Sequence, residues 1–205
     1  MKFRKTIGAA AIIAVAGLAG LEGFARETTV EKKGTIEQML MNPEGDADGF
    51  VLQDGTQVHF PPHMSAELRG AVAVKDAVEM KGVAENAKRF RAESVTNTKT
   101  GKTIKDVPPH LMGAKRPHPE GPRGPKAKER LDQLSAEGQI SRQLFGPRGE
   151  VNGVILADGT VVRVGPRARD TSEASLDVGK KLRASGYGTK NESGTSLEAT
   201  DLKNL

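Results

Sequence analysis

The side chains best suited to metal chemistry lie in one stretch of the chain. His59 and His63 are spaced four apart in HFPPH, and Glu44, Asp46 and Asp48 precede them in EGDADG. Imidazole suits transition metals, and carboxylates suit calcium. However, two histidines four apart converge on one face only in a helix, and the intervening prolines favour extended backbone.

Neither pattern completes a site. An EF-hand calcium loop needs a bidentate glutamate where this chain has Gly55, and the related later stretch has Arg163 and Arg167 in place of the two histidines. The chain has no cysteine, which excludes disulfides, thiol nucleophiles and Cys-containing metal sites. It also lacks a Gly-x-Ser-x-Gly nucleophile motif. We therefore predict a protein that is not an enzyme, with no catalytic residues, no metal and no cofactor.

These residues lie in the first copy of an internal repeat. DGFVLQDGTQVHFPPH spans residues 48–63, and the similar NGVILADGTVVRVGPR spans residues 152–167. The same register runs without a gap from Gly34 aligned with Gly138 to Gly82 aligned with Gly186. This is the signature of duplication. We predict one domain over residues 34–104, a second over residues 138–205, and a basic, proline-rich linker over residues 105–137.

The apolar periodicity within each repeat is that of short strands. Asp54-Gly55 and Asp158-Gly159 predict two-residue type I′ turns, in which both central residues have positive φ. In the first repeat we predict strands and a helix in this order: strands over residues 34–42, 49–53 and 56–60, a short helix from about Ser65, and strands over residues 76–84 and 88–97. In the second repeat the last two strands fall over residues 179–188 and 195–202. A further short helix is predicted from about Lys126 to Ala136, with Leu131 and Leu134 packed on the second domain.

Three strands, a short helix and two strands in roughly 70 residues suit an OB-fold. The pattern G-x-I, a glycine turn, L-x-DGT-x-V and then Val78, Met80 and Gly82 resembles that of OB-fold proteins. Together with the N-terminal sequence it resembles small exported bacterial OB-fold proteins, here as a tandem repeat. We predict an all-β fold with minor helix, built as two five-stranded barrels. SH3-like barrels are the alternative.

The first 25 residues have the features of a secretory signal peptide. Lys2, Arg4 and Lys5 precede an apolar run over residues 7–21, and small residues lead to cleavage after Ala25. We predict a periplasmic or secreted protein with no stable membrane span after cleavage, while a membrane anchor is the alternative. Cleavage lowers the net charge from +5 to about +3, because Glu22 leaves with the three bases.

OB-folds bind ligands mainly across the outer face of their second and third strands. If Val58 and Phe60 point into the barrel, alternation turns Gln57 and His59 outward. The arginines at and after the corresponding strand of the second repeat make its face more cationic. The predicted ligand-binding residues are Gln57, His59, His63, Arg89, Arg91, Arg163, Arg167 and Arg169.

These residues suggest a binding protein. Its predicted partner is an unknown polyanion, an envelope protein or another envelope component. Single-stranded nucleic acid is the alternative ligand, since it is the commonest ligand of the fold. It ranks second because base stacking needs exposed aromatic side chains and the chain has six phenylalanines, one tyrosine and no tryptophan. Export would also remove the protein from cytoplasmic nucleic acid. A scaffold that binds protein partners through both barrels is the third hypothesis.

Overall fold

Strand formation follows the alternation of apolar and polar side chains. In β4 (Ala77–Asn86), for example, Val78 and Met80 are buried while Glu79 and Lys81 are exposed. A pleated strand sends successive side chains to opposite faces, so this pattern buries one face and leaves the other in water. The computed structural model describes residues 28–111 and 131–205.

The first barrel closes through one parallel strand pair. Its first three strands form an antiparallel meander, the fourth returns to pair with the first, and the fifth pairs antiparallel with the fourth and parallel with the third. The strands are β1 (Val30–Met41), β2 (Ala47–Leu52), β3 (Gln57–His59), β4, and β5 (Arg89–Asn97). A short sixth strand, β6 (Thr103–Lys105), extends the sheet beyond β5.

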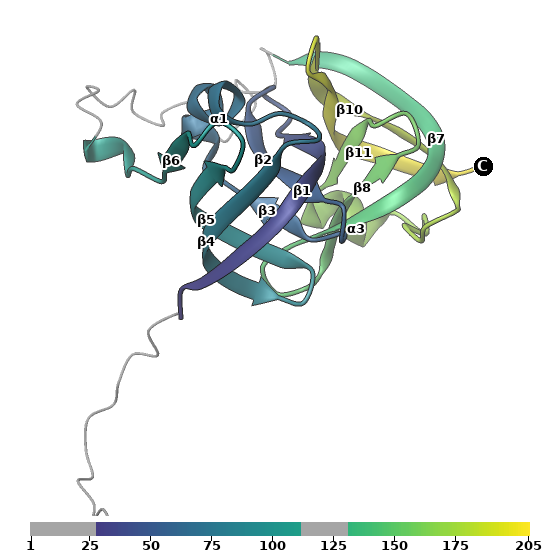
Figure 1. The fold of residues 1–205 in the computed structure, drawn as a ribbon. Helices are drawn as coiled ribbons and strands as arrows, with labels where there is room; N and C mark the ends of the chain where they lie inside the picture. Colours follow the sequence, from purple (N-terminus) through teal and green to yellow (C-terminus); the bar gives the residue numbers. More distant parts are fainter. Residues whose placement is uncertain (1–27, 112–130) are drawn as a thin grey trace, which may run out of the picture.

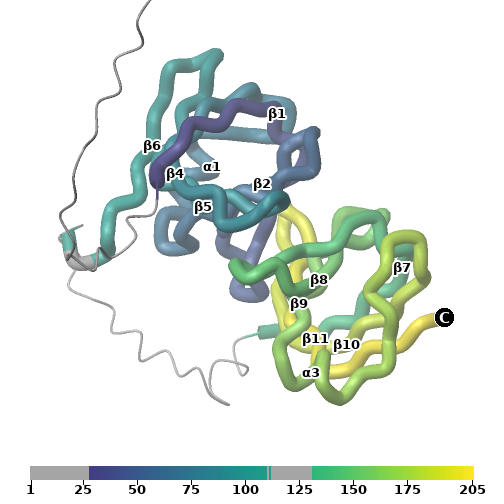
Figure 2. The backbone as a smooth tube through the Cα atoms, turned by 90° about the horizontal axis from the view of Figure 1, so that it is seen from below, coloured from purple at the N-terminus to yellow at the C-terminus, as the bar shows by residue number. Residues whose placement is uncertain are grey.

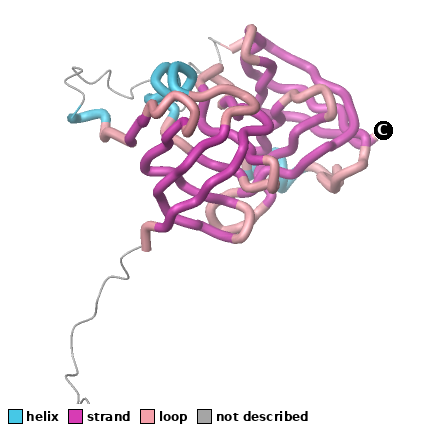
Figure 3. The backbone as a smooth tube through the Cα atoms, viewed as in Figure 1, coloured by secondary structure: helices cyan, strands magenta, loops and turns pink. Residues whose placement is uncertain are grey.

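The second barrel repeats this topology (Figure 1). Its strands are β7 (Asp132–Phe145), β8 (Val151–Leu156), β9 (Val161–Val164), β10 (Lys181–Asn191) and β11 (Gly194–Asn204), and β9 runs parallel to β11. A short helix follows the third strand of each barrel: α1 (Ser65–Ala71), after the turn η1 (Pro62–Met64), and α3 (Pro166–Thr171). A further turn, η2 (Pro109–Leu111), follows β6. Strands dominate both barrels (Figure 3), and the predicted pair of OB-fold-like barrels is confirmed.

The turns between the second and third strands differ from the prediction. Gly55 and Gly159 have φ of 83° and 87°, but neither Asp54 nor Asp158 has positive φ. The Gly55 N–H donates to the Leu52 carbonyl at 2.8 Å, which closes a four-residue turn with glycine at its last position. The predicted type I′ turn is therefore wrong, and the glycine supplies the left-handed residue after an ordinary turn.

The predicted helix over residues 126–136 is wrong where the structure describes it. Asp132 to Ala136 belong to β7, while residues 126–130 lie outside the described part of the chain. Leu134 and Ala136 alternate with exposed residues and pack against the second core, so pairing with β10 takes precedence over local helix propensity. The first strands begin at Val30 and Asp132, ahead of the starts predicted for the two domains.

Each barrel has its own apolar core, and a third apolar cluster lies between the barrels. The first core includes Phe50, Phe60 and Phe90, while the second is built from smaller aliphatic residues. The cluster between the barrels comprises Leu40, Val51, Leu144, Ile155 and Val161, each at most 5% exposed. The barrels therefore pack directly side by side (Figure 2).

Candidate functional site

The face that OB-folds commonly use for ligands is buried here against the other barrel. Gln57 is 4% exposed; its Nε2 donates to the Gln143 carbonyl at 2.7 Å, and its Oε1 accepts from the Phe145 N–H at 2.9 Å. Across the same interface, Arg163 Nη2 donates to both carboxylate oxygens of Asp48, at 2.7 and 3.0 Å. Gln57 and Arg163 therefore hold the barrels together.

The two repeats contribute corresponding contacts to this interface. Arg89 Nη1 donates to the Phe145 carbonyl at 2.9 Å, and Ser196 Oγ donates to the carbonyl of Met41, which aligns with Phe145, at 3.0 Å. Corresponding positions of the two repeats also meet in the apolar cluster between the barrels, because Leu40 aligns with Leu144 and Val51 with Ile155. A second corresponding pair joins Asn86 to the Pro147 carbonyl and Thr189 to the Pro43 carbonyl. The interface thus resembles that of a two-fold symmetric dimer within one chain.

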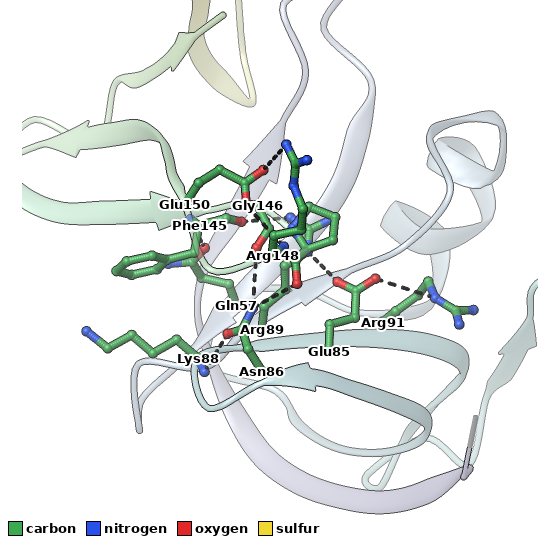
Figure 4. A network of polar contacts seen from close by, with 11 residues as sticks. Gln57, Glu85, Asn86, Lys88, Arg89, Arg91, Phe145, Gly146, Arg148 and Glu150 are labelled. Carbon is green, nitrogen blue, oxygen red and sulfur yellow. Dashed lines mark hydrogen bonds and ion pairs between the residues drawn. The ribbon is translucent and has the colours of Figure 1, made fainter. Parts of the chain in front are cut away.

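One edge of the interface gathers a group of charged side chains. We call it the junction: the β4–β5 hairpin, residues 85–89, together with Arg91 on β5 and the facing end of β7 with the β7–β8 turn, residues 145–150. Asn86 Nδ2 donates across it to the carbonyls of Gly146 and Pro147, at 3.3 and 3.4 Å. Figure 4 shows these side chains converging from the two barrels.

The charged side chains of the junction differ in exposure. The Glu85 side chain is only 15% exposed and interacts with Arg89 and, at 3.6 Å, with Arg91, whereas the Arg148 side chain is 90% exposed. Lys88 is also exposed. The second carboxylate, Glu150, is 28% exposed. Four cations therefore surround two carboxylates, and the charges turned to solvent are mainly positive.

A cleft of about 390 Å³ opens beside the junction. Its walls come from the β2–β3 and β4–β5 turns of the first barrel and from β7 of the second. Lys88 and Phe145 both line it and contact each other, with the Lys88 Nζ 4.7 Å from the centre of the Phe145 ring. The cleft thus combines a cation with an apolar ring, a pairing suited to ligands that are both anionic and aromatic.

His59 lies beside this network, and its environment favours the neutral ring. Burial lowers the pKa of His59, and the positive charges of Arg89 and Arg163 lower it further. Asp48 and Glu85 act in the opposite direction without reversing the shift.

The remaining predicted site residues are not gathered at one place. His63 is exposed in η1 and hydrogen-bonds through Nε2 with the Val107 carbonyl at 2.9 Å. Arg167 is exposed on α3, and Arg169 Nη1 on the same helix donates to the Val151 carbonyl at 3.0 Å. Of the eight predicted residues, the structure brings Arg89 and Arg91 together at the junction, with Gln57 and His59 beside them.

Sequence reasoning missed Lys88, Phe145 and Arg148. Lys88 sits in a basic hairpin, KRFR, and the repeat alignment places Phe145 opposite Met41 and Arg148 opposite Glu44. These departures from repeat symmetry were the available signal. Their convergence could not be foreseen because it depends on how the barrels pack.

Within residues 28–111 and 131–205, no three His, Asp or Glu side chains are grouped as metal ligands would be. The same residues include no helix that has both the length and the apolar character to span a membrane. The predicted signal peptide lies outside the described residues.

Comparison with known proteins gives no family. No family model matches the chain, and no curated protein matches it. Among solved structures, a tetrameric HIN2 protein is 13% identical, with a TM-score of 0.29 over 90% of this chain and 99% of that one. A deletion mutant of the single-stranded DNA binding protein from Thermus aquaticus is 16% identical, with a TM-score of 0.25 over 86% and 93% of the chains. Likenesses this weak carry no argument about function.

Proposed function

We propose that this chain is a non-enzymatic binding protein that holds a polyanion at the junction of its two barrels. The carrying observation is that Arg148 and Lys88 are exposed, whereas Glu85 is largely buried against Arg89 and Arg91. Exposed cations attract a polyanion, and the inner carboxylates hold the arginines in place.

The packing of the barrels supports this choice of surface. A ligand on the outer face of β2 and β3 would have to displace Gln57 and Arg163 from their bonds to the other barrel. The junction lies at the edge of that interface, where the cleft and the exposed cations are reachable without opening it. Because Glu85 already contacts two arginines, we assign it a positioning role.

Export remains part of the proposal and rests on residues 1–25 alone. The mature chain would begin at Arg26, and polyanions outside the cytoplasm would then be within its reach. Mass spectrometry of the protein purified from its host tests this directly, since retention of residues 1–25 would contradict cleavage.

The binding test uses fluorescence anisotropy of the mature protein with a labelled single-stranded oligonucleotide and with labelled heparin, each over a salt series. We expect Lys88→Gln/Arg148→Gln to weaken binding of both probes. For the oligonucleotide, the slope of log K against log salt should fall by about 0.7 for each phosphate that no longer pairs with a cation of the protein.

The matched control is Lys99→Gln/Lys203→Gln, which removes two exposed positive charges outside the junction. Equal losses in the two variants would show that binding follows net charge alone and would contradict the junction as the site. Arg163→Ala is unsuitable for this test, because loss of its bond to Asp48 would disturb the interface itself.

A further inference from the structure

We propose that the polyanion is single-stranded nucleic acid and that a base stacks on Phe145. This inference rests on the proposed function, because it names the ligand of the same junction. Stacking on an aromatic ring is how proteins hold unpaired bases, and it adds affinity that charge alone cannot supply.

Phe145 differs from the other phenylalanines that the structure describes. Phe50, Phe60 and Phe90 are at most 2% exposed and fill the first core. Phe145 is half-buried, belongs to none of the three apolar clusters, and lines the cleft beside the junction. Its ring is therefore placed for contact with a ligand.

The backbone of Phe145 is fixed from both sides by the first barrel. Its N–H donates to Gln57 Oε1 and its carbonyl accepts from Arg89 Nη1, each at 2.9 Å. The aligned residue of the first repeat, Met41, is 2% exposed. In the first repeat, the interface thus buries an aliphatic side chain at this position. In the second repeat, the side chain at the same position is aromatic and lines the cleft. A ring on a fixed backbone loses little further freedom when a base stacks on it.

Lys88 occupies one face of the ring in the structure. Its ammonium group lies 4.7 Å from the ring centre, a contact that stabilises little when the lysine is exposed. A base can replace it on the ring, and the released ammonium can then bind a phosphate of the same strand. Figure 4 shows Lys88 and Arg91 at opposite ends of the network, with the exposed Arg148 between them, so further phosphates would meet further cations.

The test compares a labelled dT oligonucleotide with an abasic oligonucleotide of the same length and charge, and uses heparin as a base-free polyanion. We expect the wild-type protein to bind the dT strand at least about fivefold more tightly than the abasic strand. Phe145→Leu should remove this preference and leave heparin binding unchanged. Tyr187→Leu removes an aromatic ring outside the cleft lining and should keep the preference for the dT strand.

The wild-type comparison needs no variant and stands even if Phe145→Leu fails to fold. Equal binding of the dT and abasic strands would overturn base stacking while leaving polyanion binding intact. A preference for dT that survives in folded Phe145→Leu would overturn the assignment to this ring. Failure of all three probes to bind at low salt would instead contradict the proposed function.

Discussion

His59 and Arg163 occupy the same place in the two repeats but have different partners. Arg163 reaches the Asp48 carboxylate across the interface, whereas the residue aligned with Asp48 is Asn152, whose buried Oδ1 has no hydrogen-bond partner within the described residues. Duplication followed by substitution has thus left an ion pair at only one of two related corners. At the histidine corner, burial and the positive charges of Arg89 and Arg163 lower the pKa of His59.

The pH dependence of stability follows from His59. Its pKa is lowered in the folded protein, so below about pH 6.5 the unfolded chain binds a proton that the folded chain does not. The free energy of unfolding should fall as the pH drops below 6.5, by at most about 1.4 kcal/mol per pH unit for this one proton. Urea denaturation between pH 7 and pH 5 measures this change in the free energy of unfolding.

His59→Gln should flatten this dependence, because glutamine does not titrate. His63→Gln, a matched change at an exposed histidine outside the interface, is the control. An unchanged slope in His59→Gln would show that another group causes the pH effect.

At the scale of elements, the fourth strand of each barrel bends where a glycine lies against the fifth. A Cβ built on Gly82 would lie 2.0 Å from the Arg91 carbonyl oxygen, and one on the aligned Gly186 would lie 2.0 Å from the Glu198 carbonyl oxygen. Both glycines sit at irregularities in strand pairing. Side chains are excluded there because the backbones approach so closely.

Gly82→Ala should therefore destabilise the protein by about 1–3 kcal/mol, since the backbone must shift to admit the methyl group. Gly138→Ala is the matched control, because its Cβ would meet Leu156 side-chain atoms at an ordinary 3.5 Å. Thermal unfolding of both variants measures the difference. Equal melting temperatures would show that the strand relaxes without cost.

At the scale of the molecule, the interface combines a buried apolar cluster with hydrogen bonds from both barrels. Leu40 and Leu144 belong to neither barrel's own core and are buried in the cluster between the barrels. We therefore expect the two barrels to stay associated when the chain is cut between them.

A protease site introduced within residues 112–130 tests whether the two barrels stay associated after the chain between them is cut. After cleavage, we expect the two fragments to elute together in size-exclusion chromatography, and Leu144→Ala to weaken their association, because it leaves a cavity between the barrels. Separate elution of wild-type fragments at micromolar concentration would show that the linker maintains the association.

The sequence by itself determined the duplication, the strand order and the OB-like barrels. Turn glycines and two-residue alternation are local, and the repeat presents each signal twice, as at Gly55 and Gly159. It also marked Arg89 and Arg91 as candidate binding residues. It did not determine which face is free, because Gln57 and Arg163 have the same local pattern whether they meet solvent or another barrel.

Only the tertiary structure decided that the face of β2 and β3 is an internal interface, and only packing joined Lys88, Phe145 and Arg148 from separate repeats. The β7 strand shows the same limit, since residues 132–136 became strand through pairing with β10. Contacts between segments distant in sequence depend on shape complementarity between assembled surfaces, which no local pattern encodes.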